Sequence, residues 1–181
     1  MCGIAGYFSK EPDHRLNDFL PDAIKTLSKR GPDLQQTQIL SPQVGFAHAR
    51  LSIIDTSSIA NQPMSDDTGR FTIIFNGEIF NYRELRKNFL ADVKFKSTSD
   101  TEVLLNLFMR MGKDCLQHLN GFFAFAIFAK EKNEIFIARD RFGIKPLHVY
   151  SDEKMLLFAS ELKAILQFPI KKEIDYNTLA L

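Results

Sequence analysis

The sequence predicts an α+β fold of four layers, in which two antiparallel sheets face each other and helices cover their outer faces. The main observation is residues 121–129, where both faces of a strand would be apolar: Phe122, Ala124, Ala126 and Phe128 alternate with Phe123, Phe125, Ile127 and Ala129. A polar turn at 131–134 and a second strand at 135–139 make this strand part of a hairpin. Hairpin sheets normally keep one face in water, so this double-sided burial predicts a second sheet on one side and helices on the other.

The first quarter of the chain is predicted to hold a helix between strands. Residues 3–9 have the composition of a short strand. A helix is expected over residues 21–30, because Pro21 suits the first position of a helix and Gly31-Pro32 would stop it. Further strands are expected at 36–40 and 44–54.

Two helices in the middle of the chain are predicted from a capping residue that is followed three positions later by glutamate. These starts are Asn81-Tyr82-Arg83-Glu84 and Ser99-Asp100-Thr101-Glu102. A polar loop is expected at 57–69 and a strand at 70–76. Beyond the first hairpin, strands at 146–151 and 155–159 predict a second hairpin, and a helix is expected at 160–167. The segment 174–181, with Asp175 as a candidate cap, resembles the start of another helix, so we expect a single domain over residues 1–181 that belongs to a longer chain.

Composition excludes several classes of function. With 181 residues, 45% hydrophobic and 25% charged, the chain has the balance of a folded domain. A net charge of +1 and the lack of long charge runs argue against nucleic-acid or anionic membrane partners. Two cysteines without a CxxC and no histidine pair at zinc spacing predict neither a disulfide scaffold nor a metal site, and a cytoplasmic location is the expectation.

Cys2 is the candidate nucleophile. Removal of Met1 would leave Cys2 with a thiol and a free α-amine, whose ordinary pKa of about 7.7–8.0 leaves it partly uncharged near neutral pH. One residue would then supply both nucleophile and base. The alternative interpretation is a small buried residue at the start of the first strand.

Asn76-Gly77 is the candidate oxyanion site. The Asn side-chain amide and the glycine N–H are adjacent donors at the end of an apolar strand, as acyl transfer requires. The alternative is a hairpin turn, because Asn-Gly between apolar runs is a strong hairpin signal.

Two charged residues could bind the ends of a substrate. Arg50 could clamp a carboxylate in a bidentate manner, or lie at the surface with its stem on apolar neighbours. Asp100 could bind an ammonium group, or be placed there by the helix dipole alone. A substrate that carries both charges and a cleavable amide is glutamine.

At these residues the sequence resembles the glutaminase domain of class II (N-terminal nucleophile) glutamine amidotransferases, and most closely that of asparagine synthetases. The resemblance spans nearly the whole chain in order, and it is carried by Met1-Cys2-Gly3-Ile4-Ala5-Gly6, Arg30-Gly31-Pro32-Asp33, Arg50-Leu51-Ser52-Ile53-Ile54-Asp55, Asn61-Gln62-Pro63-Met64, Phe75-Asn76-Gly77-Glu78-Ile79-Phe80-Asn81-Tyr82, Ser99-Asp100-Thr101-Glu102, Asn120-Gly121-Phe122-Phe123-Ala124-Phe125, Arg139-Asp140-Arg141-Phe142-Gly143-Ile144-Lys145-Pro146-Leu147 and Phe158-Ala159-Ser160-Glu161-Leu162-Lys163.

The resemblance implies the αββα fold of N-terminal nucleophile hydrolases and a role for each site residue. Cys2 would attack the glutamine side-chain amide and form a γ-glutamyl thioester, with Asn76 and Gly77 as the oxyanion hole. Glutamine would be held through the residues Arg50, Leu51, Ile53, Glu78 and Asp100, with the backbone of Leu51 and Ile53 completing the pocket.

The resemblance also implies what lies outside this domain. No cofactor is expected here, and ATP and Mg²⁺ are expected only in a C-terminal synthetase domain, which would use the ammonia most simply to convert aspartate to asparagine. A homodimer is left open. Leu34-Gln35-Gln36 and Asn61 depart from the family pattern, the latter standing where a histidine is common. Two other functions stay open: a binding module of the same fold without turnover, and an autonomous amidohydrolase that acts on another amide.

Overall fold

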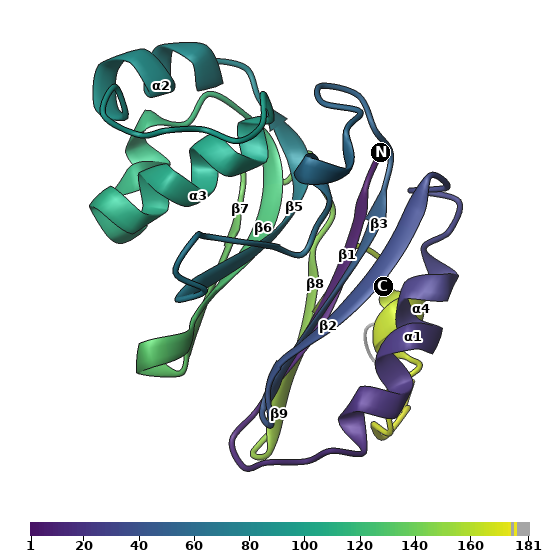
Figure 1. Ribbon diagram of the computed structural model, residues 1–181. Helices are drawn as coiled ribbons and strands as arrows, with labels where there is room; N and C mark the ends of the chain where they lie inside the picture. The colour runs from purple at the N-terminus through teal and green to yellow at the C-terminus, as the bar shows by residue number, and fades with distance from the viewer. Residues whose placement is uncertain (175, 177–181) are drawn as a thin grey trace.

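The computed structural model describes residues 1–174 and 176 and has the predicted four layers (Figure 1). One sheet has five strands in the order β2-β3-β1-β9-β8 and the other has four in the order β4-β5-β6-β7, and all pairings are antiparallel. The strands are β1 (Gly3–Ser9), β2 (Leu34–Ser41), β3 (Val44–Arg50), β4 (Met64–Ser65), β5 (Phe71–Ile79), β6 (Gly121–Ala129), β7 (Glu134–Arg139), β8 (His148–Ser151) and β9 (Met155–Ala159).

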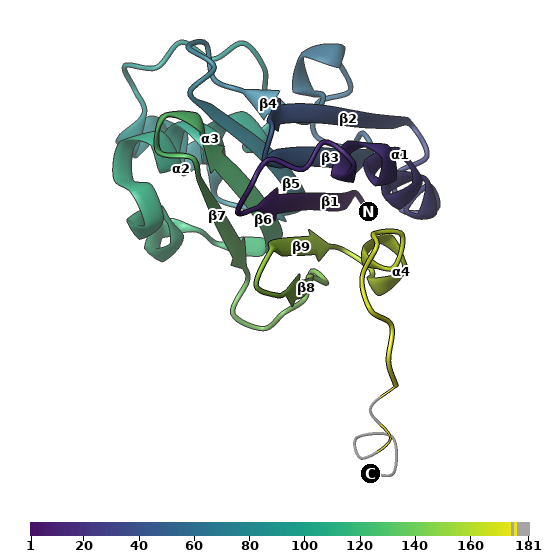
Figure 2. The same ribbon diagram turned by 90° about the horizontal axis from the view of Figure 1, so that it is seen from below.

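Helices cover the outer face of each sheet. The helices are α1 (Leu16–Thr26), α2 (Tyr82–Phe89), α3 (Asp100–Met111) and α4 (Leu162–Ile165). Figure 2 shows the layers from below, with α1 and α4 beside the five-stranded sheet and α2 and α3 beside the four-stranded one. Short 3-10 helices occur at Ser58–Ala60, Gly112–His118 and Lys130–Lys132. Each helix of the described residues is too short or too polar to cross a bilayer.

The packing of β6 confirms that both faces of this strand are buried. Its alternate residues Ala124, Ala126 and Phe128 pack between the sheets, against Ile4, Phe46 and Phe158 of the other sheet. The residues between them, Phe123, Phe125 and Ile127, pack on the helix side with residues of α3. The same alternation divides β1, where Ile4 faces the second sheet and Ala5 faces α1.

Several boundaries differ from the sequence prediction, and two of them show the largest shifts. The first helix begins at Leu16 and ends at Thr26, with Pro21 inside it, instead of running over residues 21–30. The buried stripe Leu16, Leu20, Ala23 and Ile24 recurs at helical spacing, so its packing on β1 and β3 outweighs the hydrogen bond that the proline cannot donate. The strand expected over 44–54 ends at Arg50.

Asn76-Gly77 forms no hairpin turn, so that alternative was wrong. β5 continues to Ile79 and pairs with β6 along its whole length. Both predicted capping sites do start helices, but only Ser99 caps its helix, by accepting a hydrogen bond from the Glu102 N–H at 3.2 Å. The Asn81 side chain instead donates to the His118 carbonyl. Asp175 and residues 177–181, where a further helix start was expected, lie outside the described residues.

Candidate active site

The candidate residues converge because strand alternation sends them to the same side of each sheet. Cys2 shares the strand face of Ile4, which points between the sheets, and Arg50 shares that of Phe46. Because Gly3 pairs with Ala49, Cys2 and Arg50 come to the same end of the first sheet. Asn76 shares the face of Ile74 and points into the same gap from the second sheet. His48 joins the sheets there, with Nε2 3.1 Å from the Phe75 carbonyl oxygen.

The thiol of Cys2 lies against the backbone of Leu51. Its Sγ is 3.6 Å from the Leu51 carbonyl oxygen and accepts from the Leu51 N–H at 3.4 Å. Burial raises the pKa of this thiol, and the Leu51 N–H opposes that effect. A base must therefore remove the thiol proton if Cys2 is to act as a nucleophile near neutral pH.

Arg30 holds the backbone of the candidate nucleophile. Its Nε donates to the Cys2 carbonyl at 2.9 Å, and its Nη1 pairs with Glu161 at 3.1 Å. The adjacent Gly31 lies against β3, where a Cβ would lie 2.2 Å from the Ala49 backbone. In this structure Met1 precedes Cys2, so the nitrogen of Cys2 is an amide. The Met1 sulfur accepts a hydrogen bond from Lys145 Nζ at 3.4 Å.

Asn76 has a fully buried side chain whose amide is unpaired. Its exposed fraction is 0%, and neither Nδ2 nor Oδ1 makes a hydrogen bond within the described part of the chain. Buried polar groups are nearly always paired, so an unpaired amide at the end of a strand requires an explanation. A donor kept free for a charge that develops during a reaction is one such explanation.

The Gly77 N–H is available on the same strand. The backbone N–H of Phe80 donates to the Asn120 carbonyl, and the backbone N–H of Lys130 donates to the Arg70 carbonyl. The backbone N–H and C=O groups of even-numbered residues in β5 therefore bond to β6, and those of odd-numbered residues point away from β6. On that outer edge the N–H of Ile79 bonds to Asp100, and β4 reaches only to Ile73. Gly77 has no such partner among residues 1–174. A Cβ at Gly77 would lie 2.3 Å from the Phe122 carbonyl oxygen, so the position requires glycine.

Arg50 is buried and held by the loop that follows it. Nη1 donates to the carbonyl of Ser57 at 2.9 Å and to the Asn61 side chain, and Nη2 donates to the carbonyl of Asp55. These bonds leave the Nε–H and one Nη2–H without a partner in the described residues. A guanidinium with free N–H donors can bind a carboxylate.

Asp100 lies at the start of α3 with only 5% of its surface exposed. Its Oδ2 accepts from the Ile79 N–H at 2.9 Å. Burial raises the pKa of Asp100 to about 6, and the nearby Glu78 adds to that effect. A buried carboxylate that stays ionised at neutral pH is suited to a cationic ligand.

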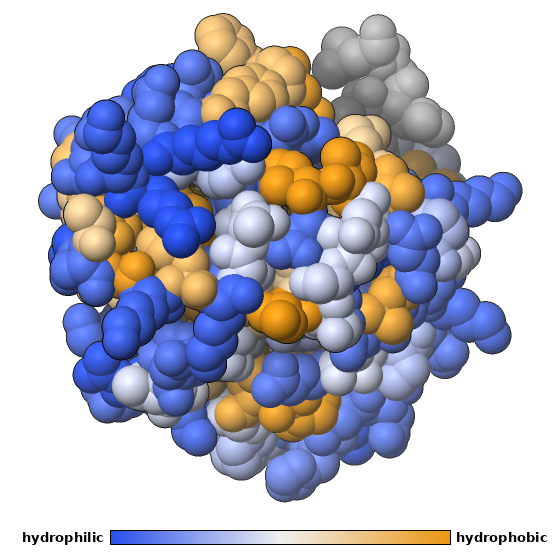
Figure 3. Space-filling view, turned by 45° about the horizontal axis from the view of Figure 1, so that its top comes forward, coloured by the Kyte–Doolittle hydropathy of each residue, from blue (hydrophilic) through white to orange (hydrophobic). Residues whose placement is uncertain are grey.

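One small pocket, of about 60 Å³, brings most of these residues together. It is lined by five of the sequence-predicted residues: Cys2, Arg50, Ile53, Gly77 and Asp100. Asn76 lies on the strand beside it, and Leu51 contributes its backbone at the thiol. Glu78 is exposed and does not line the pocket. Figure 3 shows several separate hydrophobic patches among hydrophilic residues on the face that includes this end of the molecule.

Sequence reasoning missed two loop residues. Asn61 departs from the family pattern, and its side-chain oxygen accepts a hydrogen bond from Arg50. Gln62 lines the pocket and hydrogen-bonds on both sides of it. Both belong to the segment Asn61-Gln62-Pro63-Met64, which the resemblance includes, but this polar stretch without periodicity indicates no role for either side chain.

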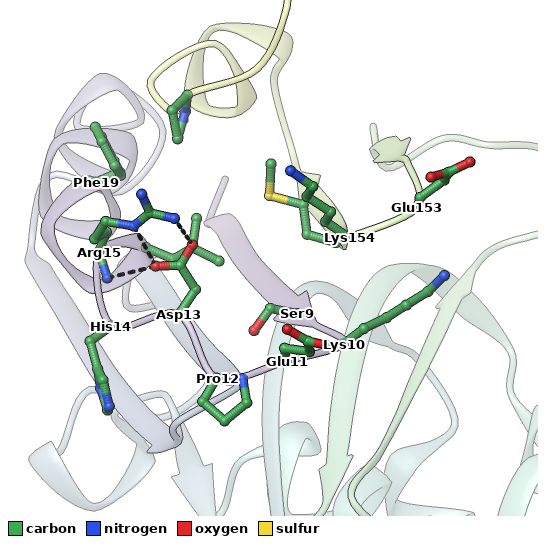
Figure 4. Close-up of a pocket in the computed structure, with 13 residues that line it drawn as sticks. Ser9, Lys10, Glu11, Pro12, Asp13, His14, Arg15, Phe19, Glu153 and Lys154 are labelled. Carbon is green, nitrogen blue, oxygen red and sulfur yellow. Dashed lines mark hydrogen bonds and ion pairs between the residues drawn. The ribbon is translucent and has the colours of Figure 1, made fainter.

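A larger hollow, of about 970 Å³, lies at the opposite end of β1 (Figure 4). It is lined by residues 9–16 and 153–155 with Phe19 and Pro169, and its charges have both signs. Arg15 is paired with Asp13 and is largely exposed. This hollow has none of the buried unpaired groups that mark the Cys2 end.

Similarities to known proteins bear on this site. A family model described as a glutamine amidotransferase domain matches residues 1–181. The chain is 42% identical over 190 residues to glutamine-hydrolyzing asparagine synthetase 3 of Bacillus subtilis, with 99% of this chain and 30% of the relative covered. It is 36% identical over 167 residues to asparagine synthetase B of Escherichia coli, with coverages of 91% and 30%.

Among solved structures, a glutamine phosphoribosylpyrophosphate amidotransferase from B. subtilis superposes with a TM-score of 0.70 at 22% identity, covering 91% of this chain and 43% of that one. At this identity the likeness shows the fold alone. The chain spans about 30% of the length of the two relatives above.

Proposed function

The chain belongs to the glutamine amidotransferase domain family, and from that premise we propose that this site hydrolyses glutamine to glutamate and ammonia through Cys2. The observation that carries the proposal is the unpaired, buried amide of Asn76 beside the free N–H of Gly77, in the same gap as the Cys2 thiol. Acyl transfer needs a nucleophile and two donors for the developing oxyanion, and these three groups supply them.

The chemistry follows from these positions. The Cys2 thiolate attacks the side-chain carbonyl carbon of glutamine, and the π electron pair of the C=O bond moves onto the oxygen. The resulting oxyanion lies between two hydrogen-bond donors, Asn76 Nδ2 and the Gly77 N–H. Collapse breaks the carbon–nitrogen bond, and the thiol proton passes through the α-amine of Cys2 to the departing nitrogen, which leaves as ammonia. Water then attacks the thioester carbon, and glutamate leaves with regeneration of the thiol. This route requires removal of Met1, because an amide nitrogen cannot act as the base.

Substrate selection would use the two charged ends of the pocket. The unpartnered Nε–H and Nη2–H of Arg50 suit the α-carboxylate, and the buried carboxylate of Asp100 suits the α-ammonium. Glutamine carries both charges on its α-carbon, and its side chain limits how far the amide can lie from them. Glu78 would act only through its charge near Asp100, since it lies outside the pocket.

We further propose that the ammonia is used by a C-terminal synthetase domain to convert aspartate to asparagine. The support is that relatives named asparagine synthetases are about three times as long as the matched region. In this proposal ATP and Mg²⁺ belong to that second domain. A cytoplasmic location agrees with Cys2 and Cys115 both being free thiols.

Intact mass spectrometry with a diazo-ketone glutamine analogue tests the glutaminase proposal. The expected result is a chain that lacks Met1 and gains one adduct on Cys2, together with release of glutamate from glutamine. A processed chain that takes no adduct and releases no glutamate would overturn it. Faster turnover of another amide would favour the autonomous amidohydrolase.

A further inference from the structure

Gln62 is a buried pocket residue that the proposed chemistry does not use. It lies between the 3-10 helix Ser58–Ala60 and β4, and 6% of its surface is exposed. Both ends of its amide are engaged. Oε1 accepts from the Phe75 N–H at 2.6 Å, and Nε2 donates to the Thr101 hydroxyl oxygen at 3.2 Å.

The bond to Phe75 fixes the edge of β5 next to the oxyanion donor. β4 pairs only with Thr72 and Ile73, so the outward N–H groups of Phe75, Gly77 and Ile79 have no partner strand. These groups follow one another at two-residue steps of about 6.6–6.8 Å. Gln62 takes the first and Asp100 takes the third. The Gly77 N–H is therefore held free between two side-chain acceptors that fix the strand on either side of it.

The bond to Thr101 connects the same strand to the other end of the pocket. Asp100 and Thr101 are neighbours in the first turn of α3, so a shift of that turn moves both side chains together. Besides the Asp100–Ile79 hydrogen bond, the Gln62 amide thus provides a second link between the strand of the oxyanion donors and the helix of the candidate ammonium ligand. Its chain neighbour Asn61 accepts from Arg50, so the same loop also supports the candidate carboxylate clamp.

We infer that Gln62 is a positioning residue that sets the separation between the amide end of the pocket, at Gly77, and the ammonium end, at Asp100. This inference rests on the proposed glutaminase function. The side chain at this position must accept a hydrogen bond from the Phe75 N–H and donate one to the Thr101 hydroxyl oxygen. An amide does both, because it has a carbonyl acceptor and an NH₂ donor. A leucine of similar size would satisfy neither.

Steady-state kinetics of glutamate release in the full-length protein test the inference, with kcat normalised to the fraction of Cys2 that the diazo-ketone analogue labels. Gln62→Leu is expected to lower kcat about 10–100-fold and to raise KM for glutamine, because displacements of about 1 Å can cost about 100-fold. Thr101→Val releases only the helix, so it should raise KM about 3–10-fold with kcat within about twofold. Thr101→Ser keeps the hydroxyl and should restore the wild-type KM.

The double variant Gln62→Leu/Thr101→Val provides the coupling test. Its KM should equal that of Gln62→Leu alone, because the shared hydrogen bond is already lost. Gln43 is the matched control: its amide donates to Ser9 and Lys10 and accepts from Asn133 at the far end of the sheets, so Gln43→Leu should leave kcat and KM unchanged.

The outcomes separate the two levels of the argument. A processed wild-type chain without glutamine turnover overturns the proposed function itself. Wild-type turnover, with a normal KM in both Gln62→Leu and Thr101→Val, overturns only the role of Gln62. Should Gln62→Leu fail to fold, the KM of Thr101→Val and its recovery in Thr101→Ser decide the question alone.

Discussion

Replacing Asn76 with leucine should make the protein more stable and less active. The Asn76 amide is fully buried and unpaired, so the fold bears its desolvation without a compensating hydrogen bond. Leaving one buried polar group unsatisfied costs about 1–3 kcal/mol, and an apolar side chain of similar length removes that cost. We therefore expect Asn76→Leu to raise the free energy of unfolding by about 1–3 kcal/mol. For a domain of this size each kcal/mol shifts Tm by about 2–4 °C.

The same substitution should remove one of the two oxyanion donors. Loss of one such donor typically lowers kcat by about 10²–10³-fold, or about 2.7–4 kcal/mol. Urea unfolding followed by circular dichroism would measure stability, and glutamate release per labelled Cys2 would measure kcat. Asn76→Ala should lose kcat equally, although its cavity would offset the gain in stability.

Asn81 provides the matched control. Its amide donates to the His118 carbonyl at 2.9 Å and accepts from the Asn120 N–H at 3.0 Å. Asn81→Leu should therefore lower the free energy of unfolding by about 1–3 kcal/mol and leave kcat unchanged. The reasoning is refuted if Asn76→Leu destabilises as much as Asn81→Leu, because the amide is then paired in the folded protein. A normal kcat in Asn76→Leu would refute the oxyanion role.

Three further substitutions test the rest of the site. Burial raises the pKa of Asp100 from its ordinary 3.8 to about 6, so its protonation favours the folded state below about pH 4 and that contribution is lost as the pH rises to 6. Asp100→Asn should accordingly stabilise by up to about 3 kcal/mol at pH 7 but by less than about 1 kcal/mol at pH 4 in urea unfolding, and it should abolish the fall of kcat/KM on acidification through pH 6. Gly77→Ala places a Cβ 2.3 Å from the Phe122 carbonyl oxygen, so we expect it to lower the free energy of unfolding by about 1–3 kcal/mol. A Tm within about 2 °C of the wild-type value would show instead that β5 and β6 can separate there. Arg50→Lys lacks the free Nε–H and Nη2–H donors and should raise KM for glutamine at least about tenfold, whereas an unchanged KM would place the carboxylate elsewhere.

The layers could be predicted because β6 carries a pattern that only one arrangement satisfies. Its two apolar faces require a covering layer on each side, and the structure supplies the second sheet and α3. Helix boundaries were harder to predict, because local signals compete with packing. Pro21 indicates a helix start by its own chemistry, but the buried stripe that begins at Leu16 places that start five residues earlier.

The site shows the same division between pattern and packing. Cys2 and the Asn76-Gly77 pair could be proposed from residue chemistry, but whether that pair forms a turn or a strand depends on β6, which lies more than 40 residues away. That Glu78 lies outside the pocket could not be predicted, because it shares the strand face of Asn76 and only its place near the end of β5 leaves it exposed. Gln62 has no signal of its own, since its role arises only when Phe75 and Thr101 come together around it.

The place of β1 between β3 and β9 has a consequence for synthesis of the chain. Ala5 of β1 pairs with Ala159 of β9, 154 residues later. The strand β1, which follows Cys2, therefore pairs with its second neighbouring strand, β9, only when most of the domain has left the ribosome. At about 5–20 residues per second this interval is about 8–30 s. Cys2 does not wait for that neighbour, because Arg30 and Leu51, which hold it, lie within the first 51 residues, and Met1 is 57% exposed in the complete fold. The strand order therefore fixes the backbone of Cys2 early in synthesis and leaves Met1 within reach of an aminopeptidase throughout.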